Sequence, residues 1–116
     1  MNNYRSVLET YRQYLDIPAH MQTVTLLEGH NPLIPMPRLA KRLGGGFELC
    51  VKFEGLNPTG SFKDRGMTVA VGEAAGRSAK AMICASTGNT AASSAAYAAR
   101  TGMRVVVIIP AGKVAG

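Results

Sequence analysis

The sequence lacks tryptophan and has only two cysteines and two histidines among its 116 residues. Cys50 and Cys84 lie in the apolar segments FELCVKF and AMICAS, and neither belongs to a CxxC pair or a Cys/His cluster. His20 and His30 have no partner at a spacing typical of metal ligands. We therefore expect two buried, reduced thiols and no metal site.

Long hydrophobic runs are also absent. No stretch approaches the roughly 18 apolar residues that a membrane-spanning helix needs, and the first residues, MNNYRSVLETYRQY, lack the apolar core of a signal peptide. With 47% hydrophobic and 17% charged residues, the composition is typical of one globular unit with a real core. We expect a cytoplasmic protein without membrane partners.

Acidic residues are few, and the net charge is +6 from 13 Lys and Arg against 7 Asp and Glu. A basic chain could bind nucleic acid if its cations clustered, but here they are scattered. In the first segment, Tyr4, Leu8, Tyr11 and Leu15 recur at helical spacing. This stripe predicts a helix over residues 3–15 that docks on a core or on a partner subunit, and we expect no nucleic-acid partner.

The remaining sequence alternates predicted helices and strands. After a proline-rich connection, EGHNPLIPMPRL, we expect a helix over 38–43, strand 47–53, helix 61–78, strand 81–85, helix 89–100 and strand 104–109. Gly44 to Gly46 end the first of these helices, and Gly102 ends the last. The order predicts an α/β fold: residues 1–46 form a helical arm and connection, and residues 47–116 begin a region of parallel βαβαβ units.

Right-handed crossovers that advance in one direction place both helices on the same face of the sheet. Only the N-terminal segment then remains to cover the other face, so the apolar strand RVVVII would be half exposed. The chain also stops at PAGKVAG, where the next crossover helix should begin. We expect this chain to be the opening part of a longer protein.

Two loops pass from a predicted strand into a helix: EGLNPTGSFKD, which contains Lys63, and ASTGNTA. Ligands of open α/β sheets bind beyond the C-terminal ends of strands, and helix N-termini favour anions. The first loop is not a Walker nucleotide site, because Ser61 and Phe62 separate Gly60 from the lysine and Asp64 follows it.

Lys63 stands where a helix dipole disfavours a cation and so favours a neutral amine. A neutral lysine attacks aldehydes and forms Schiff bases with pyridoxal phosphate. The alternative is a lysine that points to solvent while Asp64 caps the helix.

In the second loop, Ser86, Thr87, Gly88, Asn89 and Thr90 offer hydroxyls, an amide and free backbone. They suit a small carboxylate or phosphate. The alternative is ordinary helix capping, for which Ser, Thr and Asn are the preferred residues.

NPTGSFKDRGM, followed by CASTGNTAASSAAYAARTG, closely resembles the threonine synthases, members of the fold type II pyridoxal-phosphate enzymes. EGHNPLIPMPRL and VVVIIPAGKVA support the resemblance, which extends from about Leu27 to Gly116. It implies a lyase of threonine biosynthesis that converts O-phospho-L-homoserine and water to L-threonine and phosphate.

The resemblance further implies residue roles. Lys63 would hold pyridoxal 5'-phosphate as a Schiff base and move protons at substrate carbons, and Asn89 would bind the cofactor's phenolic oxygen. Ser86, Thr87, Gly88, Asn89 and Thr90 would surround the amino-acid part of the substrate. Asp64 and Arg65 belong to the motif, and we expect structural roles for them. The Tyr4 to Leu15 stripe is compatible with a homodimer of the full-length enzyme.

Related families and departures leave alternatives open. Serine and threonine dehydratases share a GSFK-type motif but usually carry an AGNH-like loop, and a catalytically silent binding module of the same fold is a second alternative. The usual Gly-x-Thr-Pro-Leu stretch is GHNPL here, where Asn31 could make the local turn that Thr makes. The groups that bind the cofactor's phosphate and pyridine nitrogen are expected beyond Gly116, so we expect the 116-residue chain to be inactive by itself.

Overall fold

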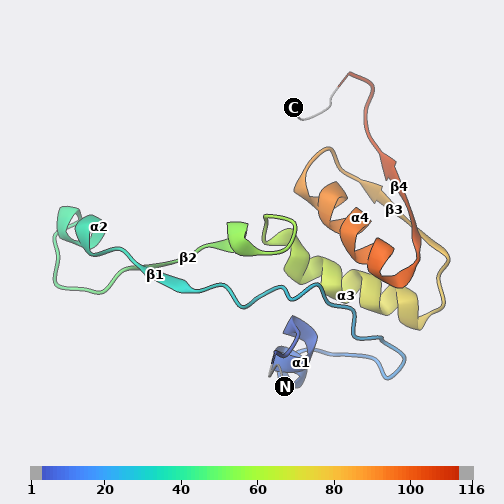
Figure 1. The fold of residues 1–116 in the computed structure, drawn as a ribbon, viewed down its shortest axis with the longest axis horizontal. Helices are drawn as coiled ribbons and strands as arrows, with labels where there is room; N and C mark the ends of the chain where they lie inside the picture. Colours follow the sequence, from blue (N-terminus) through green and yellow to red (C-terminus); the bar gives the residue numbers. More distant parts are fainter. Residues whose placement is uncertain (1–3, 113–116) are drawn as a thin grey trace.

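The computed structural model describes residues 4–112. Its elements, in chain order, are α1 (Val7–Tyr11), η1 (Arg12–Tyr14), β1 (Leu33–Pro35), α2 (Pro37–Arg42), β2 (Cys50–Lys52), η2 (Glu54–Leu56), α3 (Lys63–Gly76), β3 (Ala81–Ala85), α4 (Asn89–Thr101) and β4 (Arg104–Ile108) (Figure 1). The fold is α/β, as predicted. None of the helices within residues 4–112 is long and apolar enough to cross a membrane.

The C-terminal part forms the parallel unit β3–α4–β4. β3 and β4 pair in parallel from Ala81 opposite Arg104 to Ala85 opposite Ile108, and α4 packs on both strands. Gly102 ends α4 with φ 72°, the left-handed conformation that glycine adopts readily. This βαβ unit confirms the prediction made for residues 81–109.

The two faces of this small sheet differ sharply. Because side chains alternate along a strand, Met82 and Cys84 face α4, and Cys84 is buried. On the opposite face, Ile83 is 69% exposed, Val106 53% and Ile108 55%. The predicted half exposure of RVVVII is therefore confirmed, because no described residue covers the outer face.

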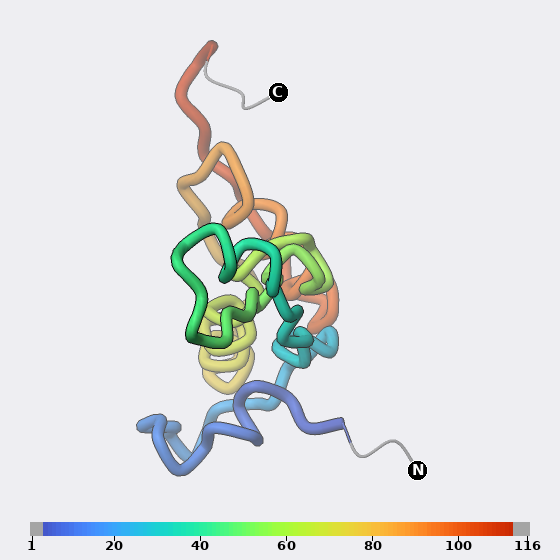
Figure 2. The backbone as a smooth tube through the Cα atoms, turned by 90° about the vertical axis from the view of Figure 1, so that its left-hand side faces the viewer, coloured from blue at the N-terminus to red at the C-terminus, as the bar shows by residue number. Residues whose placement is uncertain are grey.

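The N-terminal segment packs on α3 instead of on that outer face. In Figures 1 and 2 it passes beneath α3, on the side opposite to β4. The buried core combines Val24 of this segment with Met67 and Val71 of α3 and Tyr97 of α4. The layers therefore run from the N-terminal segment through α3 and α4 to the sheet.

The prediction of a parallel strand over residues 47–53 is wrong. The strand is shortened to β2 and pairs antiparallel with β1, with Ile34 opposite Val51, and it does not join the sheet of β3 and β4. The expected first parallel βαβ unit is thus not formed in the described part of the chain. The physical reason is that β1, from the proline-rich connection, supplies a nearby partner at the low entropy cost of a short loop closure.

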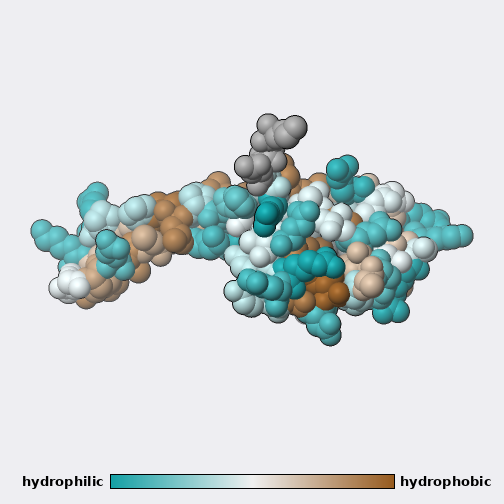
Figure 3. Space-filling model, turned by 90° about the horizontal axis from the view of Figure 1, so that it is seen from below, coloured by the Kyte–Doolittle hydropathy of each residue, from teal (hydrophilic) through white to brown (hydrophobic). Residues whose placement is uncertain are grey.

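The β1–β2 pair forms an arm that extends away from the helices and carries α2 at its tip (Figure 1). The arm makes the chain elongated: its radius of gyration is 17.3 Å, against about 13 Å for a compact chain of this length. Apolar side chains line the arm (Figure 3), among them the exposed Leu33, Phe47 and Phe53. Asn31, predicted to make a local turn, instead donates its amide to the Phe53 carbonyl oxygen across the base of the arm, at 3.1 Å.

The predicted helix 3–15 is also shorter than expected. α1 begins after a capping box between Ser6 and Glu9 and ends at Tyr11, where a single 3₁₀ turn follows. Leu8 is buried, whereas Tyr11 and Leu15 are exposed. The apolar stripe is therefore interrupted: Tyr11, the last residue of α1, is already exposed, and the 3₁₀ turn that follows changes the helical spacing before Leu15.

Candidate functional site

Lys63 is the first residue of α3, and it follows a tight turn. Gly60, with φ 80°, closes the turn by donating its N–H to the Asn57 carbonyl oxygen at 2.8 Å. The Lys63 N–H donates to Ser61 Oγ at 3.2 Å. The lysine side chain is half-buried, and its Nζ lies 4.8 Å from the centroid of the Phe62 ring. The amine thus lies beside an aromatic face.

Asp64 does not cap α3, in contrast to the alternative considered for it. The N-cap residue is Phe62, which makes no side-chain cap hydrogen bond. The fully buried Asp64 carboxylate instead accepts the Thr59 N–H at 2.8 Å, the Thr59 hydroxyl, and the Ser93 hydroxyl at 2.6 Å. Asp64 therefore joins the turn before Lys63 to helix α4.

Arg65 secures the other side of the same loop. Its Nε and one terminal nitrogen each donate to the Glu54 carboxylate at 2.8 Å, and the terminal nitrogen also donates to the Gly29 carbonyl oxygen at 3.3 Å. This pairing lowers the pKa of Glu54 and raises that of Arg65. The structural roles expected for Asp64 and Arg65 are confirmed.

The second loop enters α4 without a side-chain cap. Gly88 occupies the N-cap position, and no side chain caps the helix. Ser86 Oγ accepts the Gly88 N–H at 3.2 Å, which bends the loop but leaves the helix terminus unblocked. The capping alternative for these residues is therefore wrong, and the first turn of α4 stays available to a ligand.

Ser86 and Thr87 also line an open hollow of about 450 Å³ at the C-terminal ends of β3 and β4, where Ile108, Ile109 and Pro110 form the other wall. Open α/β sheets bind their ligands at this end of the strands. Thr87, Gly88 and Asn89 are exposed, whereas Ser86 and Thr90 are half-buried. Polar groups of the loop thus face accessible space.

The structure brings the two loops together, although β2 lies outside the β3–β4 sheet. Lys63 begins α3 and Asn89 begins α4, and the Ser93–Asp64 hydrogen bond joins the first turn of α3 to the second turn of α4. Sequence reasoning missed Ser93 because a serine in an alanine-rich helix carries no signal of a long-range partner. Its one distinctive feature is that Ser93 and Ser94 interrupt a run of alanines.

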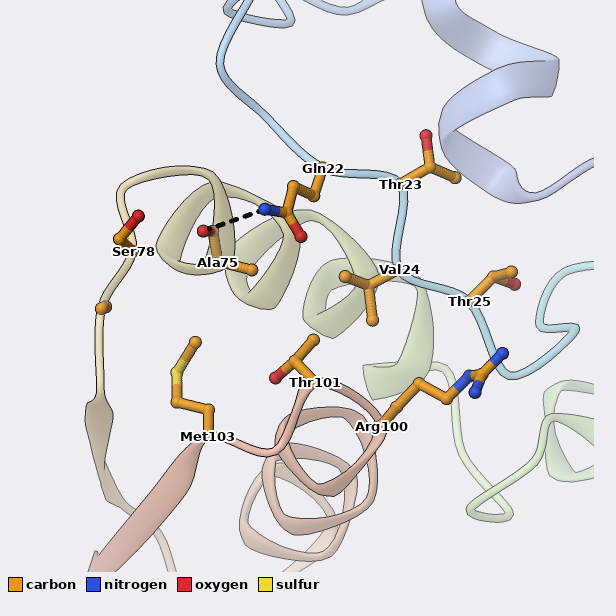
Figure 4. Close-up of a pocket in the computed structure, with 10 residues that line it drawn as sticks. Gln22, Thr23, Val24, Thr25, Ala75, Ser78, Arg100, Thr101 and Met103 are labelled. Carbon is orange, nitrogen blue, oxygen red and sulfur yellow. Dashed lines mark hydrogen bonds between the residues drawn. The ribbon is translucent and has the colours of Figure 1, made fainter.

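A separate cavity of about 410 Å³ lies at the opposite ends of the helices (Figure 4). It is lined by Gln22, whose amide donates to the Ala75 carbonyl oxygen at 3.3 Å, and by Arg100, Thr101 and Met103. None of the predicted site residues lines it. The chemistry predicted from the sequence therefore belongs to the helix N-termini, not to this second cavity.

The prediction of two buried cysteines is confirmed for one of them and wrong for the other. Cys84 is buried as predicted, but Cys50 is exposed, because β2 lies on the arm and not in a core. His20 lies 2.9 Å from Glu73, and His30 packs against Tyr4.

Comparison with known proteins agrees with these motifs. Residues 24–116 match the family described as pyridoxal-phosphate dependent enzyme. The chain is 59% identical to a threonine synthase from Synechocystis sp. over 97% of its length, 52% identical to one from Bacillus sp. over 97%, and 56% identical to one from Mycobacterium leprae over 94%. It spans only 29%, 31% and 30% of these relatives. The predicted resemblance is confirmed, and the chain belongs to the pyridoxal-phosphate dependent enzyme family.

Proposed function

We propose that this chain is part of a threonine synthase, which converts O-phospho-L-homoserine and water to L-threonine and phosphate. The observation that carries the proposal is the pairing of two helix starts. Lys63 and Asn89 are the first residues of α3 and α4, and the Ser93–Asp64 hydrogen bond holds the N-terminal parts of the two helices together. The threonine synthases at 49–59% identity support this assignment over a dehydratase.

The donor set fits the reactive half of pyridoxal phosphate. The cofactor presents an aldehyde and a phenolic oxygen, which call for a primary amine and a hydrogen-bond donor. Lys63 supplies the amine from a half-buried position, and the exposed Asn89 amide supplies the donor. When bound, pyridoxal phosphate supplies an electron sink for carbons next to the substrate's amino group.

Lys63 would have two tasks. Its Nζ would hold the cofactor, and during turnover it would take protons from substrate carbons and return them. A lysine that both holds the cofactor and acts as a base would need a side chain that can move. The Phe62 ring, 4.8 Å from Nζ, would offer an aromatic surface beside that side chain.

The loop of Ser86, Thr87, Gly88, Asn89 and Thr90 would bind the substrate's carboxylate. Its support is the uncapped start of α4, where backbone N–H groups and the helix dipole favour an anion. The bend that Ser86 makes with the Gly88 N–H keeps the loop short and close to the helix. We further propose a cytoplasmic enzyme that assembles as a homodimer.

The assay uses the longest form of the protein that its gene encodes. It is incubated with O-phospho-L-homoserine and pyridoxal phosphate, and phosphate and threonine are measured together. We expect equal amounts of both. Release of 2-oxobutanoate from threonine without phosphate release would instead identify a dehydratase, and absence of both activities would favour a silent binding module.

The lysine is tested through the cofactor's visible absorbance. We expect Lys63→Ala to abolish the band of the lysine-bound cofactor, while Lys80→Ala, at an exposed position after α3, leaves it unchanged. Borohydride reduction followed by peptide mass analysis should place the cofactor on the peptide that contains Lys63. A band that survives in Lys63→Ala would show that another group is the anchor.

A further inference from the structure

We propose that Asp64 is a positioning residue for the cofactor lysine: with Thr59 and Ser93 it forms a buried link that sets Lys63 relative to Asn89. The inference rests on the proposed attachment of the cofactor at Lys63. It goes beyond that attachment because neither Asp64 nor Ser93 would contact the cofactor in this role.

The link is built from groups withdrawn from water. Asp64 and Ser93 have no exposed surface, and Thr59 is half-buried. One carboxylate oxygen, Oδ2, accepts the Thr59 N–H at 2.8 Å, and the other, Oδ1, accepts the hydroxyls of Thr59 and Ser93. A buried carboxylate without such donors would be strongly destabilising, so these bonds restrict where Asp64 can lie.

Asp64 does not take part in an ion pair within the described part of the chain. The ion pairs among residues 4–112 join Glu54 to Arg65 and Glu73 to His20 and Arg77, and Asp64 belongs to none of them. Nor does Asp64 cap its own helix. Its hydrogen-bond partners, Thr59 and Ser93, instead lie in the loop before Lys63 and in helix α4. The relative position of that loop and that helix sets Lys63 relative to Asn89.

The places of Thr59, Asp64 and Ser93 along the chain explain how the link would position Lys63. Thr59 lies within the turn that precedes Lys63, Asp64 directly follows Lys63, and Ser93 lies one turn after Asn89. Without the link, the first turn of α3 and the preceding loop could shift against α4. A misplacement of about 1 Å can cost about a hundredfold in catalysis, and cofactor affinity depends on the same alignment.

Ser94 provides a matched control on the same helix. It is also fully buried, but its hydroxyl donates to the Ala91 carbonyl oxygen at 2.9 Å, within α4 itself. Ser93→Ala and Ser94→Ala therefore delete the same atom from neighbouring buried positions. Only the first deletion breaks a connection to the Lys63 loop.

The experiment titrates each variant of the longest encoded protein with pyridoxal phosphate, without substrate, and follows the visible band and its pH dependence. We expect Ser93→Ala to weaken cofactor binding about tenfold, the effect of losing one buried hydrogen bond, and to move the pH midpoint of the band. Ser94→Ala should leave the cofactor affinity and the pH midpoint of the band unchanged, even where the variant unfolds at a lower temperature. A purely structural role would lower thermal stability in both variants and move neither cofactor value in the folded protein.

A second pair covers the case in which Ser93→Ala does not fold. Thr59→Val removes the hydroxyl that donates a hydrogen bond to Asp64, and Thr59→Ser keeps that hydroxyl. Cofactor binding should therefore weaken in Thr59→Val and stay close to wild type in Thr59→Ser. Equal binding and equal pH midpoints in both pairs would overturn the positioning role while leaving the proposed function intact. A wild-type protein that shows no lysine-bound cofactor would overturn both. Cofactor on Lys63 without threonine formation would overturn only the proposed reaction.

Discussion

Gly72, in the middle of α3, tests whether the N-terminal segment is packed as closely as the structure indicates. A Cβ added at Gly72 would lie 2.5 Å from the Gln22 carbonyl oxygen, 3.5 Å from Met21 Cγ and 3.6 Å from Leu8 Cδ1. The nearest of these atoms belongs to the backbone, so it cannot turn aside as a flexible side chain could. The same segment also donates the Gln22 N–H to the Gly72 carbonyl oxygen at 3.1 Å.

The expected magnitude follows from two opposing effects. Gly→Ala within a helix stabilises by about 1 kcal/mol through backbone entropy and propensity. Forcing a methyl group into occupied space costs about 1–3 kcal/mol, and moving the segment away also weakens a hydrogen bond worth about 1 kcal/mol. The clash prevails, and Gly72→Ala should lower the free energy of unfolding by about 1–3 kcal/mol. For a chain of this size that corresponds to a fall in Tm of roughly 4–15 °C.

The control lies in the same helix. A Cβ at Gly66 would meet nothing within 4 Å, so Gly66→Ala should gain up to about 1 kcal/mol. Both variants are compared with wild type by urea unfolding followed by circular dichroism. If Gly72→Ala proved as stable as Gly66→Ala, residues 20–22 would not be packed against α3, and the core of Val24, Met67, Val71 and Tyr97 would need another arrangement.

Two further predictions concern charge and thiols. Because Arg65 lowers the pKa of Glu54, the stability that this carboxylate contributes should be present above its unfolded pKa of about 4.3 and be lost as pH falls through the lower folded value. The advantage of wild type over Glu54→Gln in urea unfolding should therefore shrink between pH 5 and pH 2.5, and an advantage constant over that range would contradict the pairing. In the folded protein, iodoacetamide should modify the exposed Cys50 and spare the buried Cys84, so Cys50→Ser should show no fast modification; equal reaction of both thiols would refute the burial of Cys84.

The parts of the fold that the sequence predicted well are those with local causes. β3, α4 and β4 follow from short apolar runs around an alanine-rich helix that Gly102 ends. α2 likewise begins with a proline, and three glycines with positive φ follow its end. In each case the signal is contained within the element or its immediate flanks.

The errors arose where a distant partner decides the structure. Phe47 to Phe53 has the composition of a strand, but composition does not specify which strand it pairs with, and the structure pairs it with β1. The same choice exposes Cys50, whose apolar neighbours predicted burial. The prediction of a helix over 3–15 was wrong for a related reason: Tyr4 and Leu8 are packed, but Tyr11 and Leu15 are exposed, so no packed surface stabilises the end of the stripe.

The two loops of the candidate site meet for a different reason from the one expected. The sequence predicted that both would follow strands of one sheet, yet the strand before Lys63 belongs to another sheet. They meet because α3 packs on α4 and Asp64 accepts a hydrogen bond from Ser93 across that contact. Lys63 and Asn89 could be named as candidates because their chemistry is visible in the residue type. Ser93 could not, since its importance lies in a hydrogen bond to a residue 29 positions away. If that bond positions Lys63, substitutions buried between α3 and α4 should alter cofactor binding more than substitutions on the exposed arm, although the arm lies directly before the lysine loop in sequence.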